Sequence, residues 1–184
     1  MRTSVNAGDL QLLRKWETVG VVFVFLLGAL LHFVFEWSGS SPVVGAFASV
    51  NESVWEHFKQ GYWPMLVWAI AEYAFLPQYR AGIPIAKAAA VYILPVVTGL
   101  VFYAYSSIIG REILIVDILI FLAAIIVAQF ASYKIISSRR LTASTRWLGI
   151  GLIIILGAIL VLFTFYPPHL PILLDHNTGM YGIP

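Results

Sequence analysis

The sequence predicts an all-α membrane protein, a polytopic bundle of about five transmembrane helices forming one domain over residues 1–184. Three observations predict this class. Of 184 residues, 60% are hydrophobic and only 11% are charged, whereas a soluble domain carries about 25% charged residues. The apolar residues fall in long runs without the alternation of a barrel strand. Only helices and closed barrels satisfy their backbone groups in hydrocarbon, so these runs are expected to be helical.

The composition also excludes several function classes. The charges are too few to cover a water-facing surface, which excludes a soluble globular enzyme, a disordered chain and a nucleic-acid binder. The chain has no cysteine, which excludes disulfides, thiolate catalysis and thiolate-bound zinc or iron–sulfur sites. The partners expected for such a chain are membrane lipids, a lipid substrate or other membrane subunits, with no nucleic acid.

The expected spans follow one another with short connections. They cover residues 19–35, 51–76, 85–105, 113–133 and 147–166, and residues 167–184 form an extracytoplasmic tail. The first run is an alternative candidate for a signal peptide, because Ala46-Phe47-Ala48 resembles a cleavage site. About ten residues separate this tripeptide from an apolar run that is longer than a normal signal-peptide core. A retained span is therefore favoured.

The second span needs more than its apolar residues. The run 62–76 has about 15 residues and reaches about 22 Å, which is short of the roughly 30 Å hydrocarbon core. We therefore expect the helix to begin earlier, near Asn51, which draws Glu52, Glu56 and His57 toward or into the outer leaflet. A short span with local thinning of the bilayer is the alternative.

The lysines and arginines predict the orientation in the cell membrane. A cytoplasmic N-terminus places nine cations in the cytoplasm and two outside, a clear positive-inside bias that requires an odd number of spans and an extracytoplasmic C-terminus. The nine are Arg2, Arg14, Lys15, Arg80, Lys87, Lys134, Arg139, Arg140 and Arg146, and the two are Lys59 and Arg111.

With this orientation the histidines and most acids lie toward the extracytoplasmic face. They are His32, His57, His169 and His176, together with Glu36, Glu52, Glu56, Glu112 and Asp175. His32 and Glu36 are four residues apart and share one helical face. They are candidates to share a metal ion, or for the carboxylate to orient the imidazole. The other interpretation is that His32 and Glu36 are simply polar residues at the end of the span, where the helix meets water at the membrane interface.

The segment 49–59 is the most informative in the chain. Ser49-x-x-Glu52 fits a capping box, which favours a structural role for Glu52 at the start of a helix. Glu56 and His57 have no such structural explanation, and together they are expected to line a pocket, with Glu56 as a candidate general base.

Two further acids lie within spans. Asp117 is in the outer half of the fourth span, where a carboxylate must be partnered or protonated, which makes it a candidate catalytic residue. Its candidate partners are His32, Tyr103, Tyr105 and Arg111. Glu72 lies near the cytoplasmic end of its span, and we expect it to snorkel or to pair with Arg80.

The tail contains too many prolines to span the membrane, and residues 175–179 form a turn rich in side-chain hydrogen bonding. An apolar tail of this kind is expected to fold back over the outer mouth of the bundle. That would bring Asp175 and His176 toward the other polar residues. An ordinary surface turn is the alternative.

These observations predict a His/Glu/Asp cluster that binds metal, with Zn²⁺ as the expected ion. The predicted ligands are His32, Glu36, His57, Asp175 and His176, and the predicted catalytic residues are Glu56 and Asp117. The function this favours is a metal-dependent hydrolase acting on a lipid or membrane-embedded substrate. The alternatives are a non-catalytic subunit or assembly factor of a membrane complex and a small proton-coupled transporter.

The segment Asn51-Glu52-Ser53-Val54-Trp55-Glu56-His57, with His32-x-x-x-Glu36 before it and the Pro-Pro-x-x-Pro tail after it, resembles an uncharacterised family of small prokaryotic polytopic membrane proteins. The resemblance covers most of the chain and implies no activity. A looser analogy links the chain to membrane hydrolases of the ceramidase and adiponectin-receptor type, whose zinc site combines histidines, an aspartate and a serine. That analogy implies His32, His57 and His176 as ligands, assisted by Asp117 or Asp175. Those hydrolases resemble seven-helix bundles with an H-x-x-x-H motif, which this chain lacks.

Overall fold

A computed structural model describes residues 6–138 and 143–183, and over these residues the chain is helical. Its long helices are α1 (Ala7–Trp37), α3 (Val54–Phe75), α4 (Ile83–Ile109), α5 (Leu114–Ser137) and α6 (Ala143–Phe165). Short helical turns occur at α2 (Pro42–Gly45), η1 (Pro77–Tyr79) and η2 (Pro171–Leu173). No strand is present in the described ranges, where Leu174 and Tyr181 form one isolated β-bridge. The predicted all-α class is confirmed.

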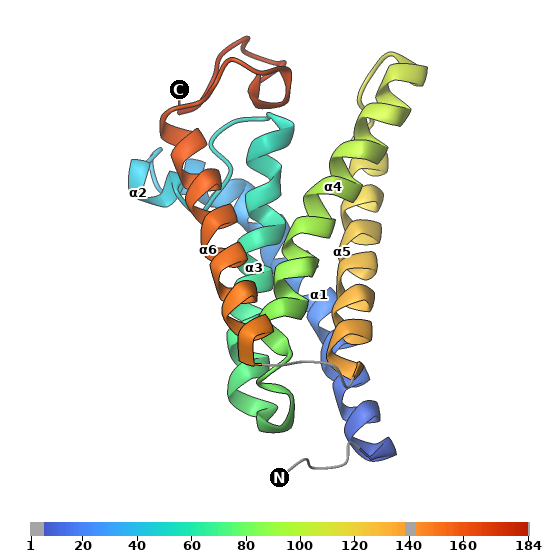
Figure 1. Ribbon diagram of the computed structural model, residues 1–184. Helices are drawn as coiled ribbons and strands as arrows, with labels where there is room; N and C mark the ends of the chain where they lie inside the picture. The colour runs from blue at the N-terminus through green and yellow to red at the C-terminus, as the bar shows by residue number, and fades with distance from the viewer. Residues whose placement is uncertain (1–5, 139–142, 184) are drawn as a thin grey trace.

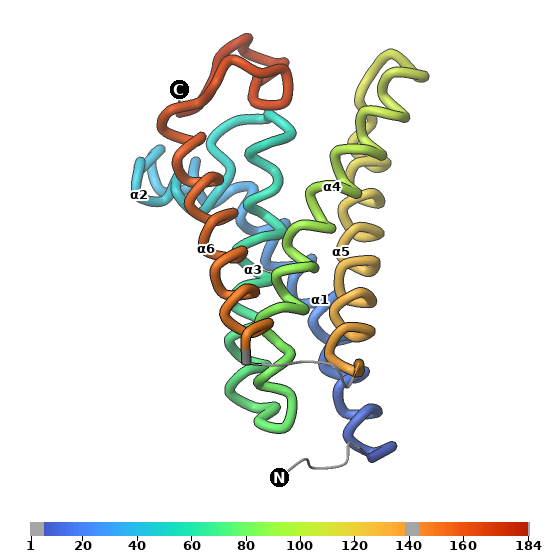
Figure 2. The backbone as a smooth tube through the Cα atoms, viewed as in Figure 1, coloured from blue at the N-terminus to red at the C-terminus, as the bar shows by residue number. Residues whose placement is uncertain are grey.

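The long helices run side by side along one axis (Figure 1). Helix α1 starts at one end of the bundle, and the tail follows α6 at the opposite end, as the tube in Figure 2 shows. We refer to these as the N-terminal end and the tail end. Helix α3 packs against α1, α4 and α6, and α5 packs against α1 and α4. Helix α4 also packs against α6. Half of the residues of α3, 11 of 22, are buried, which makes it the most enclosed of the long helices.

Four of the helices, α1, α4, α5 and α6, are long and apolar enough to cross a membrane. Helix α3 has 22 residues, a length of about 33 Å, but it carries Glu56, His57, Lys59 and Glu72 along with its apolar residues. The fifth span therefore stays a prediction, as does the orientation. Of the cations that predicted it, Arg2, Arg139 and Arg140 lie outside the described residues.

Helix α1 begins earlier than its apolar run because a capping box fixes its first turn. The backbone N–H of Asp9 donates to Asn6 Oδ1 at 2.8 Å, and the backbone N–H of Asn6 donates to Asp9 Oδ2 at 3.2 Å. Reciprocal bonds of this kind satisfy N–H groups that have no partner inside the helix. The first helix thus starts at Ala7 rather than near residue 19.

The apolar core lies along the axis of the bundle and takes side chains from all five long helices, among them Val24, Met65, Val91, Ile125 and Leu160. Large apolar side chains also cover the outside of the helices, for example Leu26, Leu119 and Ile154. An outer surface this apolar is typical of helices that face lipid rather than water.

Helices α1 and α3 lie in close contact where α1 has a glycine. A Cβ atom added at Gly28 would lie 2.5 Å from the backbone oxygen of Gln60 and 2.9 Å from the ring of Phe121. His32 is one turn further along α1 and on the same face. The close approach at Gly28 therefore brings His32 next to α3.

We predict that Gly28→Ala lowers the midpoint of thermal unfolding in detergent, because overpacking against backbone costs about 1–3 kcal/mol. Gly151→Ala in α6 is the matched control, since nothing lies within 4 Å of a Cβ added there. Alanine at that position is expected to leave the midpoint unchanged or to raise it, because alanine favours a helix by about 1 kcal/mol over glycine. Equal midpoints for wild type and Gly28→Ala would contradict the close approach.

Candidate functional site

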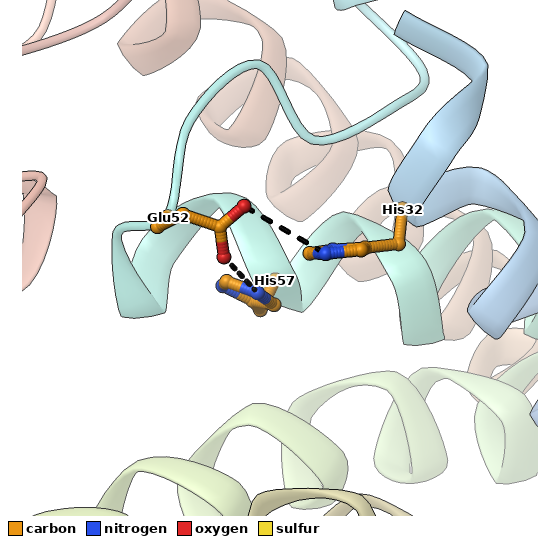
Figure 3. Close-up of side chains that lie close together, drawn as sticks. All are labelled: His32, Glu52 and His57. Atoms are coloured by element: carbon orange, nitrogen blue, oxygen red, sulfur yellow. Dashed lines mark ion pairs between the residues drawn. The ribbon is translucent and has the colours of Figure 1, made fainter. Parts of the chain in front are cut away.

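Three side chains meet at the tail end of the bundle, one from α1, one from the loop before α3 and one from α3 (Figure 3). His32 Nε2 lies 3.7 Å from Glu52 Oε1, and His57 Nε2 lies 3.4 Å from Glu52 Oε2. The two imidazole rings are 5.4 Å apart, centre to centre. One ligand atom from each of the three residues lies within 4.8 Å of the other two. We call these three residues the tail-end site.

The start of α3 decides where Glu52 points. The backbone N–H of Ser53 donates to Asn51 Oδ1 at 2.9 Å, and Ser53 then caps the helix, its Oγ accepting from the backbone N–H of Glu56 at 3.3 Å. The helix consequently begins at Val54, close to the expected start near Asn51. An Asn turn of this kind competes with an earlier helix start.

The predicted capping box of Ser49 and Glu52 is wrong. Ser49 Oγ donates instead to the backbone oxygen of Glu56 at 3.1 Å. Glu52 precedes the N-cap residue Ser53, so its side chain has no capping role and turns toward the two histidines.

Each imidazole is held by a hydrogen bond on its Nδ1 side. His57 Nδ1 lies 2.8 Å from the carbonyl oxygen of Ser53, and because a carbonyl only accepts, Nδ1 carries the proton. His32 Nδ1 forms a 2.9 Å hydrogen bond with the side-chain amide of Gln60, whose Nε2 also donates to Ser49 Oγ at 3.0 Å. Both rings are therefore oriented with Nε2 toward Glu52.

The tail-end site is open. The side chain of Glu52 is 48% exposed and those of His32 and His57 are 31% and 32% exposed. The hydrogen bond from His57 lowers the pKa of the Glu52 carboxyl, and the charges of both histidines act in the same direction, against the effect of partial burial. The Glu52 carboxylate is thus ionised at neutral pH, and its oxygens can accept hydrogen bonds or bind a cation.

The donor set and its spacing suit a metal ion. Two imidazole nitrogens and one carboxylate oxygen are a ligand set used by catalytic zinc. Zinc–nitrogen bonds of about 2.0–2.1 Å in a tetrahedral arrangement separate neighbouring ligand atoms by about 3.4 Å. The contacts of 3.4 and 3.7 Å run from the two histidine nitrogens to different oxygens of Glu52, and one ligand atom from each of the three residues lies within 4.8 Å of the other two.

A buried ion pair supports the loop that carries Glu52. Lys59 Nζ pairs with the Glu56 carboxylate and donates to the carbonyl of Gly45 at 2.6 Å and to Thr164 Oγ1 at 2.9 Å. Glu56 Oε1 accepts from Thr164 Oγ1 at 2.9 Å, and Oε2 accepts from the backbone N–H of Val50 at 3.1 Å. Both oxygens of Glu56, a predicted general base, are therefore occupied by contacts that position the loop.

Two other predicted site residues lie apart from this group. Asp117 accepts a hydrogen bond from Tyr105, one of its expected partners, and Tyr105 Oη also accepts from the backbone N–H of Ile113 at 3.1 Å. The pair thus ties together the turn between α4 and α5. Glu36 is exposed in the last turn of α1 and is not a member of the tail-end site.

The tail folds back on the bundle as expected. Asn51 Nδ2 donates to the carbonyl of Gly182 at 2.8 Å, and Ile183 packs against the core cluster that contains Phe35 and Val50. The tail does not add its own polar residues to the tail-end site.

The polar residues of the tail bond to one another within a turn, as the alternative of an ordinary surface turn describes, except that Asp175 is buried. The Asp175 carboxylate accepts from the backbone N–H of Asn177 at 2.8 Å and from Thr178 Oγ1 at 2.9 Å. His176 is exposed, as is His169, whose ring lies 4.7 Å from that of Tyr181. Of the predicted ligands, the structure brings together His32 and His57, and it adds Glu52.

The expected partner of Glu72 is also wrong. Glu72 Oε2 lies 2.9 Å from Lys87 Nζ. Arg80 donates instead to the backbone carbonyls of Tyr73 and Ala74, at 2.8 and 3.2 Å. Lys87 is fully buried and points into the bundle, which a count of charges along the chain does not reveal.

Comparison with known proteins adds one finding. Residues 5–183 match a family of unknown function, DUF6512. The chain belongs to this family. No curated protein and no solved structure matches the chain. The predicted membership of an uncharacterised family is thereby confirmed, and the analogy to ceramidase-type hydrolases stays a prediction.

We predict that Lys59→Met destabilises this DUF6512 member by about 3–5 kcal/mol, because it leaves the buried Glu56 carboxylate without its cation. Lys134→Met is the control, since Lys134 is exposed near the N-terminal end and its removal is expected to cost little. The double variant Glu56→Gln/Lys59→Met should regain part of the loss. Unfolding by denaturant in detergent measures all three, and equal losses for Lys59→Met and Lys134→Met would refute the buried pair.

Proposed function

We propose that this protein binds Zn²⁺ at the tail-end site and uses it to hydrolyse an ester or amide bond in a lipid or other membrane-embedded substrate. One observation carries the proposal: two imidazoles from different helices direct Nε2 at the two oxygens of one carboxylate. Two histidines and a glutamate are the protein ligands of zinc hydrolases that keep the fourth position for water.

The groups behind the ligands support this role. Histidines that bind metal donate their other ring nitrogen to a carbonyl or carboxylate, which fixes the ring and raises its basicity. The Ser53 carbonyl does this for His57. At His32 the hydrogen bond between Nδ1 and the Gln60 side-chain amide fixes the orientation of the ring.

The exposure of the ligands favours catalysis over a purely structural metal. Structural zinc sites are closed by four protein ligands, whereas catalytic sites leave a position open. The tail-end site offers three ligands, each a third to a half exposed. A zinc ion here would supply an ionised water at neutral pH and polarise the carbonyl of the substrate.

Neighbouring aromatic residues favour a lipid substrate. The ring of Phe33 lies edge-on to His32 at 4.9 Å and stacks with Trp37 at 5.8 Å. Both aromatic side chains are exposed at the end of α1. Exposed aromatics at the ends of apolar helices are typical of the interface between membrane and water, where headgroup ester and amide bonds lie.

The proposed orientation places the tail-end site on the extracytoplasmic face of the cell membrane, with α3 as the fifth span. Exposed cations support it: Arg14, Lys15, Arg80 and Lys134 lie toward the N-terminal end, and Arg111 lies toward the tail end. Lys59 does not weigh against it because it is neutralised inside the bundle by Glu56.

We predict that the purified protein binds one Zn²⁺ per chain and that His57→Ala or Glu52→Gln weakens binding by about 100-fold, since each removes a ligand. Calorimetric titration of metal-free protein measures the affinity. His169→Ala and His176→Ala are the controls, because these exposed histidines lie outside the tail-end site and their removal should leave the affinity unchanged.

A second experiment tests hydrolysis. In mixed micelles, fluorogenic ester- and amide-linked lipids should be cleaved, chelation should stop cleavage, and Zn²⁺ should restore it. Stoichiometric binding of zinc without cleavage of either lipid class would reject the hydrolase activity and leave only a structural role for the metal.

The orientation has its own test, made simple by the absence of cysteine. Asn177→Cys in the tail and Gln78→Cys between α3 and α4 place single thiols at exposed positions at the two ends of the bundle. We expect a membrane-impermeant thiol reagent to label Asn177→Cys in intact cells and Gln78→Cys only after lysis. The reverse pattern would invert the topology.

A further inference from the structure

A second group of ionisable side chains is enclosed in the half of the bundle nearer the N-terminal end. Lys87 Nζ of α4 lies 2.7 Å from Glu17 Oε2 of α1, 2.9 Å from Glu72 Oε2 of α3 and 2.8 Å from Gln129 Oε1 of α5. Ser132 Oγ of α5 donates to Glu17 Oε1 at 2.7 Å. We call these five residues the Lys87 cluster, and each is buried.

The charges of the Lys87 cluster do not balance. It contains two carboxylates, Glu17 and Glu72, and a single ammonium group, Lys87. The other buried pair of the bundle, Glu56 and Lys59, has one charge of each sign and needs no further ion. An uncompensated negative charge is costly inside a bundle surrounded by hydrocarbon, so the Lys87 cluster requires one additional positive charge.

The hydrogen bonds place the missing charge at Glu72. Both oxygens of Glu17 are occupied, by Lys87 and by Ser132. Glu72 Oε1 is buried without a hydrogen-bond partner in the described part of the chain, and so are Gln129 Nε2 and Trp68 Nε1. A proton on Glu72 would remove the excess charge, and Oε1 is the carboxylate oxygen of the cluster that no hydrogen bond or ion pair occupies.

Among the described residues, no cation other than Lys87 forms an ion pair with the carboxylates of the cluster. The guanidinium of Arg80 is bound to backbone carbonyls, and Arg146, the only ionisable residue of α6, has its guanidinium 5.2 Å from the Trp147 ring. Toward the N-terminal end the cluster is covered by an apolar layer that includes Leu13 and Ile136. The tyrosines of this layer, Tyr79 and Tyr133, are the titratable groups that face it there.

We propose that the Lys87 cluster is a proton-binding site, in which the Glu72 carboxylate takes up one proton from solvent and releases it again as the pH rises. Uptake forms one O–H bond and changes the net charge of the cluster from minus one to zero. The four helices α1, α3, α4 and α5 all supply contacts to this cluster, so the proton is linked to how they pack. Intramembrane carboxylates of this kind serve proton relays and proton-coupled carriers. This inference does not depend on the metal proposed at the tail-end site.

Infrared spectroscopy of the full chain in lipid nanodiscs tests the proposal, because a protonated carboxyl has a C=O band separate from that of a carboxylate. In sodium-free buffer, the wild type should lose about one buried carboxyl band per chain as the pH is raised between about 5 and 9. Glu72→Gln should abolish this loss. Glu17→Gln should abolish it too, because one carboxylate then balances one ammonium.

Two further variants sharpen the result. Glu56→Gln is the matched control, since Glu56 is equally buried but already balanced by Lys59, and the band should titrate as in the wild type. Lys87→Gln leaves two carboxylates without a cation, and the carboxyl band should increase about twofold as both become protonated. The fluorescence of the six tryptophans, of which Trp68 lies one turn from Glu72 on the same face of α3, checks that each variant is folded.

Three results would overturn the proposal. The first is a wild type with no titrating carboxyl band across this pH range, a result that needs no variant to fold. The second is a band that persists in both Glu17→Gln and Glu72→Gln. The third is loss of the band on adding NaCl at constant pH, which would mean that the additional charge is a metal cation rather than a proton.

Discussion

The structure depends on the need to neutralise charge inside an apolar bundle. Helix α3 carries Glu56, Lys59 and Glu72 through the most enclosed position, and each is paired where water is excluded. Lys59 is bound within α3 and to α6, and Glu72 is bound to a lysine of α4. Breaking a pair of this kind leaves a buried charge, which is strongly unfavourable. The pairs therefore fix the height and rotation of α3, and with them the positions of Glu52 and His57.

The same need for neutralisation determines which ligand each of the two groups of polar residues can bind from solvent. At the tail-end site the charges are partly solvated, and a ligand as large as a metal ion or a lipid headgroup has access to them. In the Lys87 cluster every member is buried, and a proton is the smallest ligand that corrects its charge. Between them, Glu56 and Lys59 are balanced and saturated with contacts, which suits a support and not a reacting group.

The fold was predictable from the sequence because length and hydropathy decide whether a helix suits a membrane. The site was predictable only in part. His32 and His57 stand out as histidines beside acids at one end of the spans, but Glu52 was assigned to a helix cap. Two consecutive S-x-x-E patterns, at residues 49–52 and 53–56, compete for that role. In the structure Ser53 caps the helix, and Glu56 is held by a hydrogen bond from Thr164 of α6. The burial of Lys87 was not predictable either, because the linear sequence does not show which residues surround a lysine side chain in the folded protein.

The partners of α3 also constrain how the chain is made. A lysine or acid within an isolated helix raises the cost of membrane insertion, and α3 carries Glu56 and Lys59 near its start and Glu72 near its end. Thr164 and Lys87, which bind Lys59 and Glu72, belong to helices that leave the ribosome after α3. Helix α3 is thus unsuited to partition into lipid on its own. The proposed fifth span therefore depends on α4, whose Lys87 pairs with Glu72.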